Sequence, residues 1–126
     1  MNKNNCPSWF DLEAKKEWKR IVKILEVEKV DFTEKDLKAL EGYCMSYSKW
    51  KKCEQYLMKN GYTFEAGNGY IQQRPEVAIS NKAMQEMRAY QKELGLTPAA
   101  RTRMNKNITE NTTKSEDEES MEELIS

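Results

Sequence analysis

The chain has 126 residues, of which 38% are hydrophobic and 33% charged, and its acidic and basic side chains are equal in number. This length and composition are typical of one soluble, helix-rich domain with a modest core. No apolar run approaches the roughly 20 residues that cross a bilayer, so we expect no membrane partner. The N-terminal sequence MNKNNCPSW has no apolar signal segment, and we therefore expect a cytoplasmic protein.

The sequence lacks residues that several enzyme classes need. It contains no histidine, which excludes Ser-His-Asp and Cys-His nucleophiles and removes a usual zinc ligand. It also lacks the GxxxxGK[ST] loop of one large class of ATPases. Its cysteines, Cys6, Cys44 and Cys53, have neither CxxC spacing nor the pattern of a disulfide framework. We therefore predict a protein that is not an enzyme, binds no cofactor or metal, and keeps its cysteines reduced.

An amphipathic pattern predicts a first helix from about Asp11 to Val27, after a flexible arm over residues 1–10. One face is apolar and predicted to be buried: Ala14, Trp18, Ile21, Val22 and Leu25. The opposite side is basic: Lys15, Lys16, Lys19, Arg20 and Lys23. This basic side is either a solvated surface or a strip that contacts nucleic-acid phosphates, and both interpretations stay open.

The longest predicted helix extends from Thr33 to Gly61. Thr33 and Asp36 form a variant of the capping box at its start, and Gly61 is typical of a helix end. Its apolar stripe is wide, with Glu54 interrupting it, and a wide stripe indicates two covering partners. The stripe consists of Leu40, Tyr43, Tyr47, Trp50 and Leu57. Either both partners belong to the same domain, or a second copy of the chain covers one flank and these five residues are an oligomer interface.

Three lysines flank Trp50 in the middle of this helix: Lys49, Lys51 and Lys52. A cationic cluster beside an aromatic ring can bind nucleic acid by stacking. A buried tryptophan with surface lysines around it produces the same pattern, and we favour that second interpretation.

The pattern after the long helix is that of a β-hairpin. β-forming residues at 62–65 and 70–73 flank the pair Asn68-Gly69, which favours a tight turn. Two strands alone are only marginally stable in water. We therefore expect this hairpin to lean on the helices or on a neighbouring molecule.

A third helix is predicted to begin at Pro75, which suits a first helical position, and to end at Gly95. Its apolar stripe is Ile79, Ala83, Met87, Tyr90 and Leu94. A short terminal helix then begins at Pro98. It closes with Arg101 and Arg103, which are further candidates for contact with DNA.

The charge of the chain is distributed unevenly. Residues 1–104 carry 19 Lys/Arg and 14 Asp/Glu, whereas residues 105–126 carry 2 and 7. We expect residues 105–126 to be a disordered acidic tail. Met121, Leu124 and Ile125 near its end are candidates for contact with a partner protein. The fold class expected for residues 11–104 is mainly α, with two long antiparallel helices, a short β-hairpin, a third helix and a short terminal helix.

The order of these signals also matches a known pattern. The matching residues are Trp18, Thr33-Glu-Lys-Asp36, Leu40-x-x-Tyr43-Cys44-x-x-Tyr47, Gly61, Asn68-Gly69, Pro75 and Leu94-Gly-Leu-Thr-Pro-Ala-Ala-Arg101. In this order and spacing they resemble the P27-like small subunits of tailed-phage terminases. Arg74 stands where that family commonly has Asn, and Ala100 replaces a frequent Ser.

The resemblance implies a function that the spacing itself does not show. Small terminase subunits form homo-oligomeric rings that recognise double-stranded viral DNA for packaging. They present it, in the cytoplasm of the host cell, to the large terminase subunit, which holds the ATPase and nuclease. The resemblance supplies no DNA-contact residues, so the candidates remain the basic residues named above.

Two other classes of protein compete with this interpretation. One is a small helical DNA-binding transcription regulator, although a helix-turn-helix normally joins shorter helices than those predicted here. The other is a purely structural helical scaffold, for which the basic side of the first helix is incidental.

Overall fold

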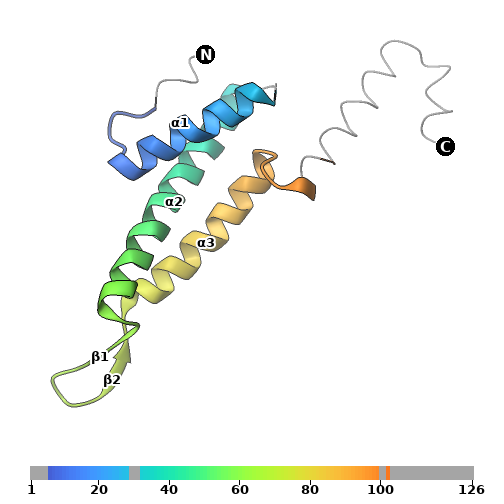
Figure 1. Ribbon diagram of the computed structural model, residues 1–126. Helices are drawn as coiled ribbons and strands as arrows, with labels where there is room; N and C mark the ends of the chain where they lie inside the picture. The colour runs from blue at the N-terminus through green and yellow to red at the C-terminus, as the bar shows by residue number, and fades with distance from the viewer. Residues whose placement is uncertain (1–5, 29–31, 100–101, 103–126) are drawn as a thin grey trace, which may run out of the picture. The chain divides into compact units, whose positions relative to one another are not determined.

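Figure 1 shows the computed structural model, in which residues 6–28, 32–99 and 102 are described. The elements are α1 (Leu12–Val27), α2 (Glu34–Asn60), β1 (Thr63–Glu65), β2 (Ile71–Gln73) and α3 (Pro75–Glu93). The predicted mainly α fold with a hairpin is therefore confirmed. The chain divides into two units, residues 1–90 and 91–126, and each is described by itself. None of the helices in the described ranges is long and apolar enough to span a membrane.

Local capping explains where α1 begins and where α2 begins and ends. The Asp11 carboxylate accepts a hydrogen bond of 2.9 Å from the Ala14 N–H and so caps α1. The Asp36 carboxylate accepts one of 2.9 Å from the Thr33 N–H at the start of α2. Gly61 ends α2 with a φ of 82°, a conformation that a side chain would strain. The signals at Thr33 and Gly61 thus placed both ends of α2, whereas the sequence offered Ser8 and Asp11 as caps for the first helix and the structure uses Asp11.

α1 and α2 pack antiparallel, since Asp11 at the start of α1 contacts Ser48 while Glu17, one and a half turns later, contacts Tyr43. The face of α1 predicted to be buried is buried: Ala14, Trp18, Ile21, Val22 and Leu25. Leu40 and Cys44 of α2 are likewise fully covered, at 0% exposure. These side chains form the core, whose burial drives the pairing of the two helices.

α3 lies along the other flank of α2 (Figure 1). The Ser46 hydroxyl donates to Glu86 at 3.2 Å, and the Ser80 hydroxyl donates to Glu54. The Tyr90 ring approaches α2 so closely that a Cβ at Gly42 would lie 2.4 Å from its Cζ. The long helix is therefore covered by two elements of its own domain, the first of the two interpretations of its wide stripe.

The buried face of α3 differs in part from the predicted stripe. Ala83 and Met87 are buried as predicted, but Ile79 is 47% exposed and Ser80 is buried instead. The reason is the polar contact between Ser80 and Glu54, which turns the neighbouring isoleucine toward solvent. The same contact explains why Glu54 interrupts the apolar stripe of α2.

The hairpin forms where it was predicted, with Phe64 paired to Gln72 in antiparallel register. Its turn contains Gly69 with a φ of 86°. The Arg74 guanidinium anchors its base, because it lies 5.8 Å from the centre of the Tyr56 ring and 5.6 Å from that of Phe64. The guanidinium also donates to the Asn60 carbonyl at 3.3 Å, which ties the hairpin to the end of α2.

The second unit begins within the last turn of α3. Leu94 is buried and Gly95 has a φ of 71°, consistent with a helix end at this point. Residues 98, 99 and 102 are helical, in the region predicted for the short terminal helix. Arg101, Arg103 and the acidic tail with Met121, Leu124 and Ile125 lie outside the described residues.

Candidate nucleic-acid interface

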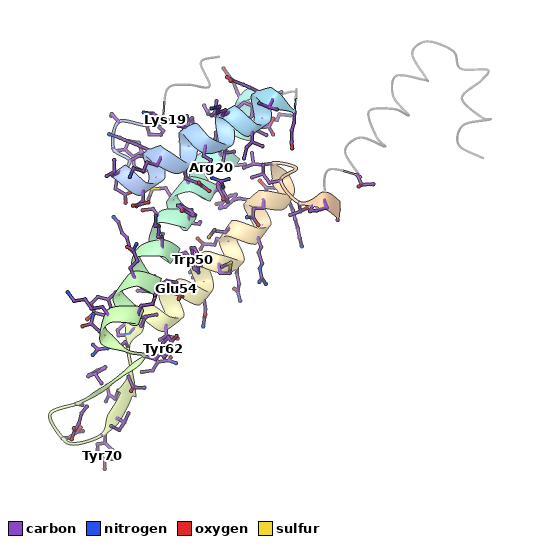
Figure 2. All side chains as sticks on the ribbon, viewed as in Figure 1. Lys19, Arg20, Trp50, Glu54, Tyr62 and Tyr70 are labelled. Carbon is purple, nitrogen blue, oxygen red and sulfur yellow. The ribbon has the colours of Figure 1, made fainter. Side chains whose placement is uncertain are left out.

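The basic side of α1 lies opposite its buried apolar side, because burial of the apolar residues fixes the rotation of the helix. Figure 2 labels two members of this basic side, Lys19 and Arg20. Its exposed members are Lys16, Lys19, Arg20 and Lys23, and Lys15 at the edge is half-buried. The structure therefore brings all five predicted α1 residues onto one surface. Like charges at i, i+4 spacing on this surface cost the helix a few tenths of a kcal/mol per pair.

Arg20 differs from the lysines because its charge is compensated. Its Nε and Nη2 donate to the two carboxylate oxygens of Glu17 at 2.6 and 2.7 Å. Glu17 is only 4% exposed and also accepts a hydrogen bond of 2.6 Å from the Tyr43 hydroxyl. The bond to Glu17, opposed by partial burial, raises the pKa of Arg20 above its ordinary value. Arg20 thus serves to neutralise a buried carboxylate as well as to face solvent.

Three lysines on this side lie outside close ion pairs, although the hydrogen bond from Lys51 and the charge of Lys16 both contribute to lowering the pKa of the Glu13 carboxyl. Within the part of the chain that the structure describes, Lys16, Lys19 and Lys23 form none of the ion pairs within 4.0 Å. We call these three residues the lysine face. Ammonium groups of this kind attract phosphates and release counterions when they bind.

Two of the three lysines around Trp50, Lys51 and Lys52, are neutralised within the subunit. Lys51 pairs with Glu13 at 2.8 Å and Lys52 with Asp11 at 2.6 Å. Trp50 is itself half-buried. The interpretation that these lysines surround a packed tryptophan therefore holds for Lys51 and Lys52. Both form ion pairs with acidic residues at the start of α1.

Asp11 is the centre of this contact between α1 and α2. Its carboxylate accepts hydrogen bonds from the Ser48 hydroxyl at 2.8 and 2.7 Å, in addition to the Ala14 N–H and Lys52. Burial disfavours the charged form, but the bonds from Lys52, Ala14 and Ser48 outweigh it and lower the pKa of Asp11 from 3.8 to about 2.

Three of the five residues predicted as an oligomer interface are covered by the subunit's own side chains. Leu40 is 0%, Tyr43 2% and Leu57 3% exposed, so these three offer no surface to a second copy. Tyr47 and Trp50 are half-buried, with ring centres 6.3 Å apart. Within one subunit these three side chains are therefore part of the core, whereas Tyr47 and Trp50 keep exposed surface, and a contact of the stripe with another copy stays a prediction.

Comparison with known proteins identifies the family to which the chain belongs. The family model described as phage terminase, small subunit, matches residues 14–111, which include the lysine face and the hairpin. The chain belongs to this family. No curated protein and no solved structure matched the chain. The assignment of this terminase small subunit therefore depends on the match of the family model to residues 14–111 of its sequence.

Sequence reasoning missed two features of the small subunit. The first is the network of Glu17, Arg20 and Tyr43, whose only local signal is the i, i+3 spacing of Glu17 and Arg20. The second is an exposed group of aromatic and aliphatic side chains at the hairpin end, whose signal was the low charge of residues 62–73.

Asp11→Asn in the small subunit is expected to reduce stability in a pH-dependent manner. A carboxylate whose folded pKa is lowered stabilises the fold above its unfolded pKa and loses that effect as the pH falls through the folded value. The difference in unfolding free energy between wild type and variant should therefore shrink between about pH 4 and pH 2. Asparagine retains the capping function, so the comparison isolates the charge. Urea unfolding at several pH values measures it, and a difference that does not change with pH would contradict the assignment.

Proposed function

We propose that this small subunit is a non-catalytic, oligomeric adaptor in viral genome packaging. It binds double-stranded viral DNA and presents it, in the host cytoplasm, to the large terminase subunit, which supplies ATPase and nuclease activity. The family assignment supports this role, and the P27-like subtype is the branch that the sequence motifs favour. The single observation that carries the DNA-binding part is that the three lysines of the lysine face are exposed and outside the close ion pairs of the described residues.

The proposed DNA contact is made through phosphates. Lys16, Lys19 and Lys23 project from one side of α1, and Lys15 extends that surface at its edge. Contacts to phosphates position a protein on the duplex without reading its sequence. Arg101 and Arg103 remain candidates from the sequence alone, as do Met121, Leu124 and Ile125 for the large subunit.

Assembly of several copies would strengthen the binding of DNA, which is weak for the phosphate contacts of one copy. A few phosphate contacts give non-specific dissociation constants of about 10⁻⁴ to 10⁻⁶ M at physiological salt. Repeating the lysine face around a ring raises the overall affinity by effective concentration, without any new contact per subunit. A homo-oligomeric ring is therefore part of the proposal.

Native mass spectrometry of the full chain at micromolar concentration tests the oligomeric part. We expect one dominant species of many copies, because closed heterologous contacts produce rings of defined size. A chain that remains a monomer or dimer under these conditions would contradict the proposal and would fit a small transcription regulator instead.

A further inference from the structure

Exposed apolar side chains concentrate at one end of the first unit. Among the described residues, nine large hydrophobic side chains are exposed, and six of them lie between Tyr56 and Ile79. Met58 is 83%, Tyr70 69% and Ile71 69% exposed. Figure 2 shows Tyr62 at the base of the hairpin and Tyr70 toward its far end. An apolar group of this kind on a small soluble chain indicates an interaction surface.

The backbone of the hairpin is incompletely paired as well. The sheet has only the strands β1 and β2 in the described part of the chain, so each strand has one free edge. The Arg74 N–H bonds the Tyr62 carbonyl and the Ala66 N–H bonds the Tyr70 carbonyl. The alternation of an antiparallel ladder then directs the N–H and C=O groups of Ile71 and Gln73 outward from β2. Such edges pair readily with another strand.

The hairpin carries too little charge to be a nucleic-acid surface. Within residues 62–73 the only charged side chain is Glu65, in a chain of which a third is charged. Interfaces between proteins are enriched in tyrosine and methionine and depleted of charge in their centre, as this surface is. Its partner is therefore a protein that offers an apolar, uncharged face with a free strand edge.

A second copy of this chain meets that description. Every copy presents a β1 edge and a β2 edge on opposite sides of the same neutral hairpin. Pairing of the β1 edge of one copy with the β2 edge of the next uses two different surfaces, and repeated contacts of this kind close into rings. The contacts of Arg74 with Tyr56, Phe64 and the Asn60 carbonyl hold the hairpin in one direction, as a ring requires.

We propose that the hairpin, with Tyr62, Tyr70, Ile71 and the adjoining Met58, is the surface through which one copy of the small subunit binds the next. This inference rests on the proposed oligomeric function and names a contact surface separate from the stripe of α2, in which Leu40, Tyr43 and Leu57 are buried. It also assigns a role to the segment that is only marginally stable as an isolated two-stranded sheet.

The variant Tyr70→Ser/Ile71→Ser tests the proposal in the full chain. Both side chains are 69% exposed, so helicity by circular dichroism should be unchanged. Loss of two apolar anchors is expected to raise the dissociation constant of assembly by on the order of tenfold or more. The matched control is Trp9→Ser/Leu12→Ser, which removes two apolar side chains of 65% exposure from the start of α1. The control should assemble like the wild type.

A second measurement keeps the test decisive if the double variant loses its hairpin. A photo-crosslinking amino acid is placed at position 71 in an otherwise wild-type chain, and ¹⁵N-labelled and unlabelled copies are mixed. We expect crosslinks between labelled and unlabelled peptides that map to residues 62–73. Crosslinks only within one copy, or only to added large subunit, would overturn the proposal.

The outcomes separate this inference from the function on which it rests. If the double variant forms the wild-type ring and the crosslinks fall elsewhere, the hairpin contact is wrong and the ring is retained. If the wild-type chain is monomeric at micromolar concentration, both the hairpin contact and the oligomeric function are wrong.

Discussion

Replacing Lys16, Lys19 and Lys23 together by Gln is expected to flatten the salt dependence of DNA binding. Each lost phosphate contact lowers the slope of log K against log salt by about 0.9, so the loss reaches about 2.7 per subunit. At low salt this corresponds to a decrease in affinity of about tenfold or more. Helicity should be unchanged, because all three side chains are exposed and the i, i+4 repulsion between Lys19 and Lys23 is removed.

The control for this variant is Lys35→Gln/Lys49→Gln/Lys59→Gln on α2. These three lysines are also exposed, so the net charge changes equally while the lysine face is retained. Titrations of a fluorescent duplex at several salt concentrations compare the two variants. An equal decrease in slope for both would show that general charge, and not the lysine face, controls binding. Arg20 is left in place, since its removal would leave the buried Glu17 without its cation.

The largest loss of stability is expected for Trp18→Ala. Trp18 is 0% exposed and its ring packs edge-on against Phe10, with centres 5.9 Å apart. Truncating a buried aromatic residue removes apolar burial and leaves a cavity, at a cost of about 3–5 kcal/mol. Because small domains are stable by only about 5–15 kcal/mol, the variant should unfold at a much lower urea concentration.

Trp9→Ala is the matched control for the core variant. Trp9 is 65% exposed and its ring contacts Phe10 with centres 4.9 Å apart, so its truncation should cost less than about 1 kcal/mol. Urea unfolding monitored by circular dichroism compares the two. Similar losses for Trp9 and Trp18 would contradict the placement of the core between α1 and α2.

The helices and the hairpin could be predicted from the sequence because their signals are local. The caps at Asp11 and Thr33, the chain reversal at Gly69 and the apolar face of α1 each depend on residues within a few positions of one another. Periodicity alone then determined which side of α1 is basic. The lysine face was predictable for the same reason.

Contacts between distant segments were not predictable in the same way. A wide apolar stripe on α2 indicates two partners but does not identify them, and the burial of Tyr43 against Glu17 follows only from the antiparallel pairing of α1 and α2. Ile79 is exposed because its neighbour Ser80 faces α2 and donates a hydrogen bond to Glu54, which is 26 positions away in the chain. Polar pairs across helix interfaces have no periodic signature, so they are recognised only in the fold.

The affinity of the full wild-type chain for a DNA duplex, measured at salt concentrations between about 50 and 200 mM, tests the central claim most directly. If the lysine face binds phosphates, log K should fall linearly with log salt, with a slope of about −3 or steeper. Binding that does not change with salt, or no binding at the lowest salt concentration, would contradict the account.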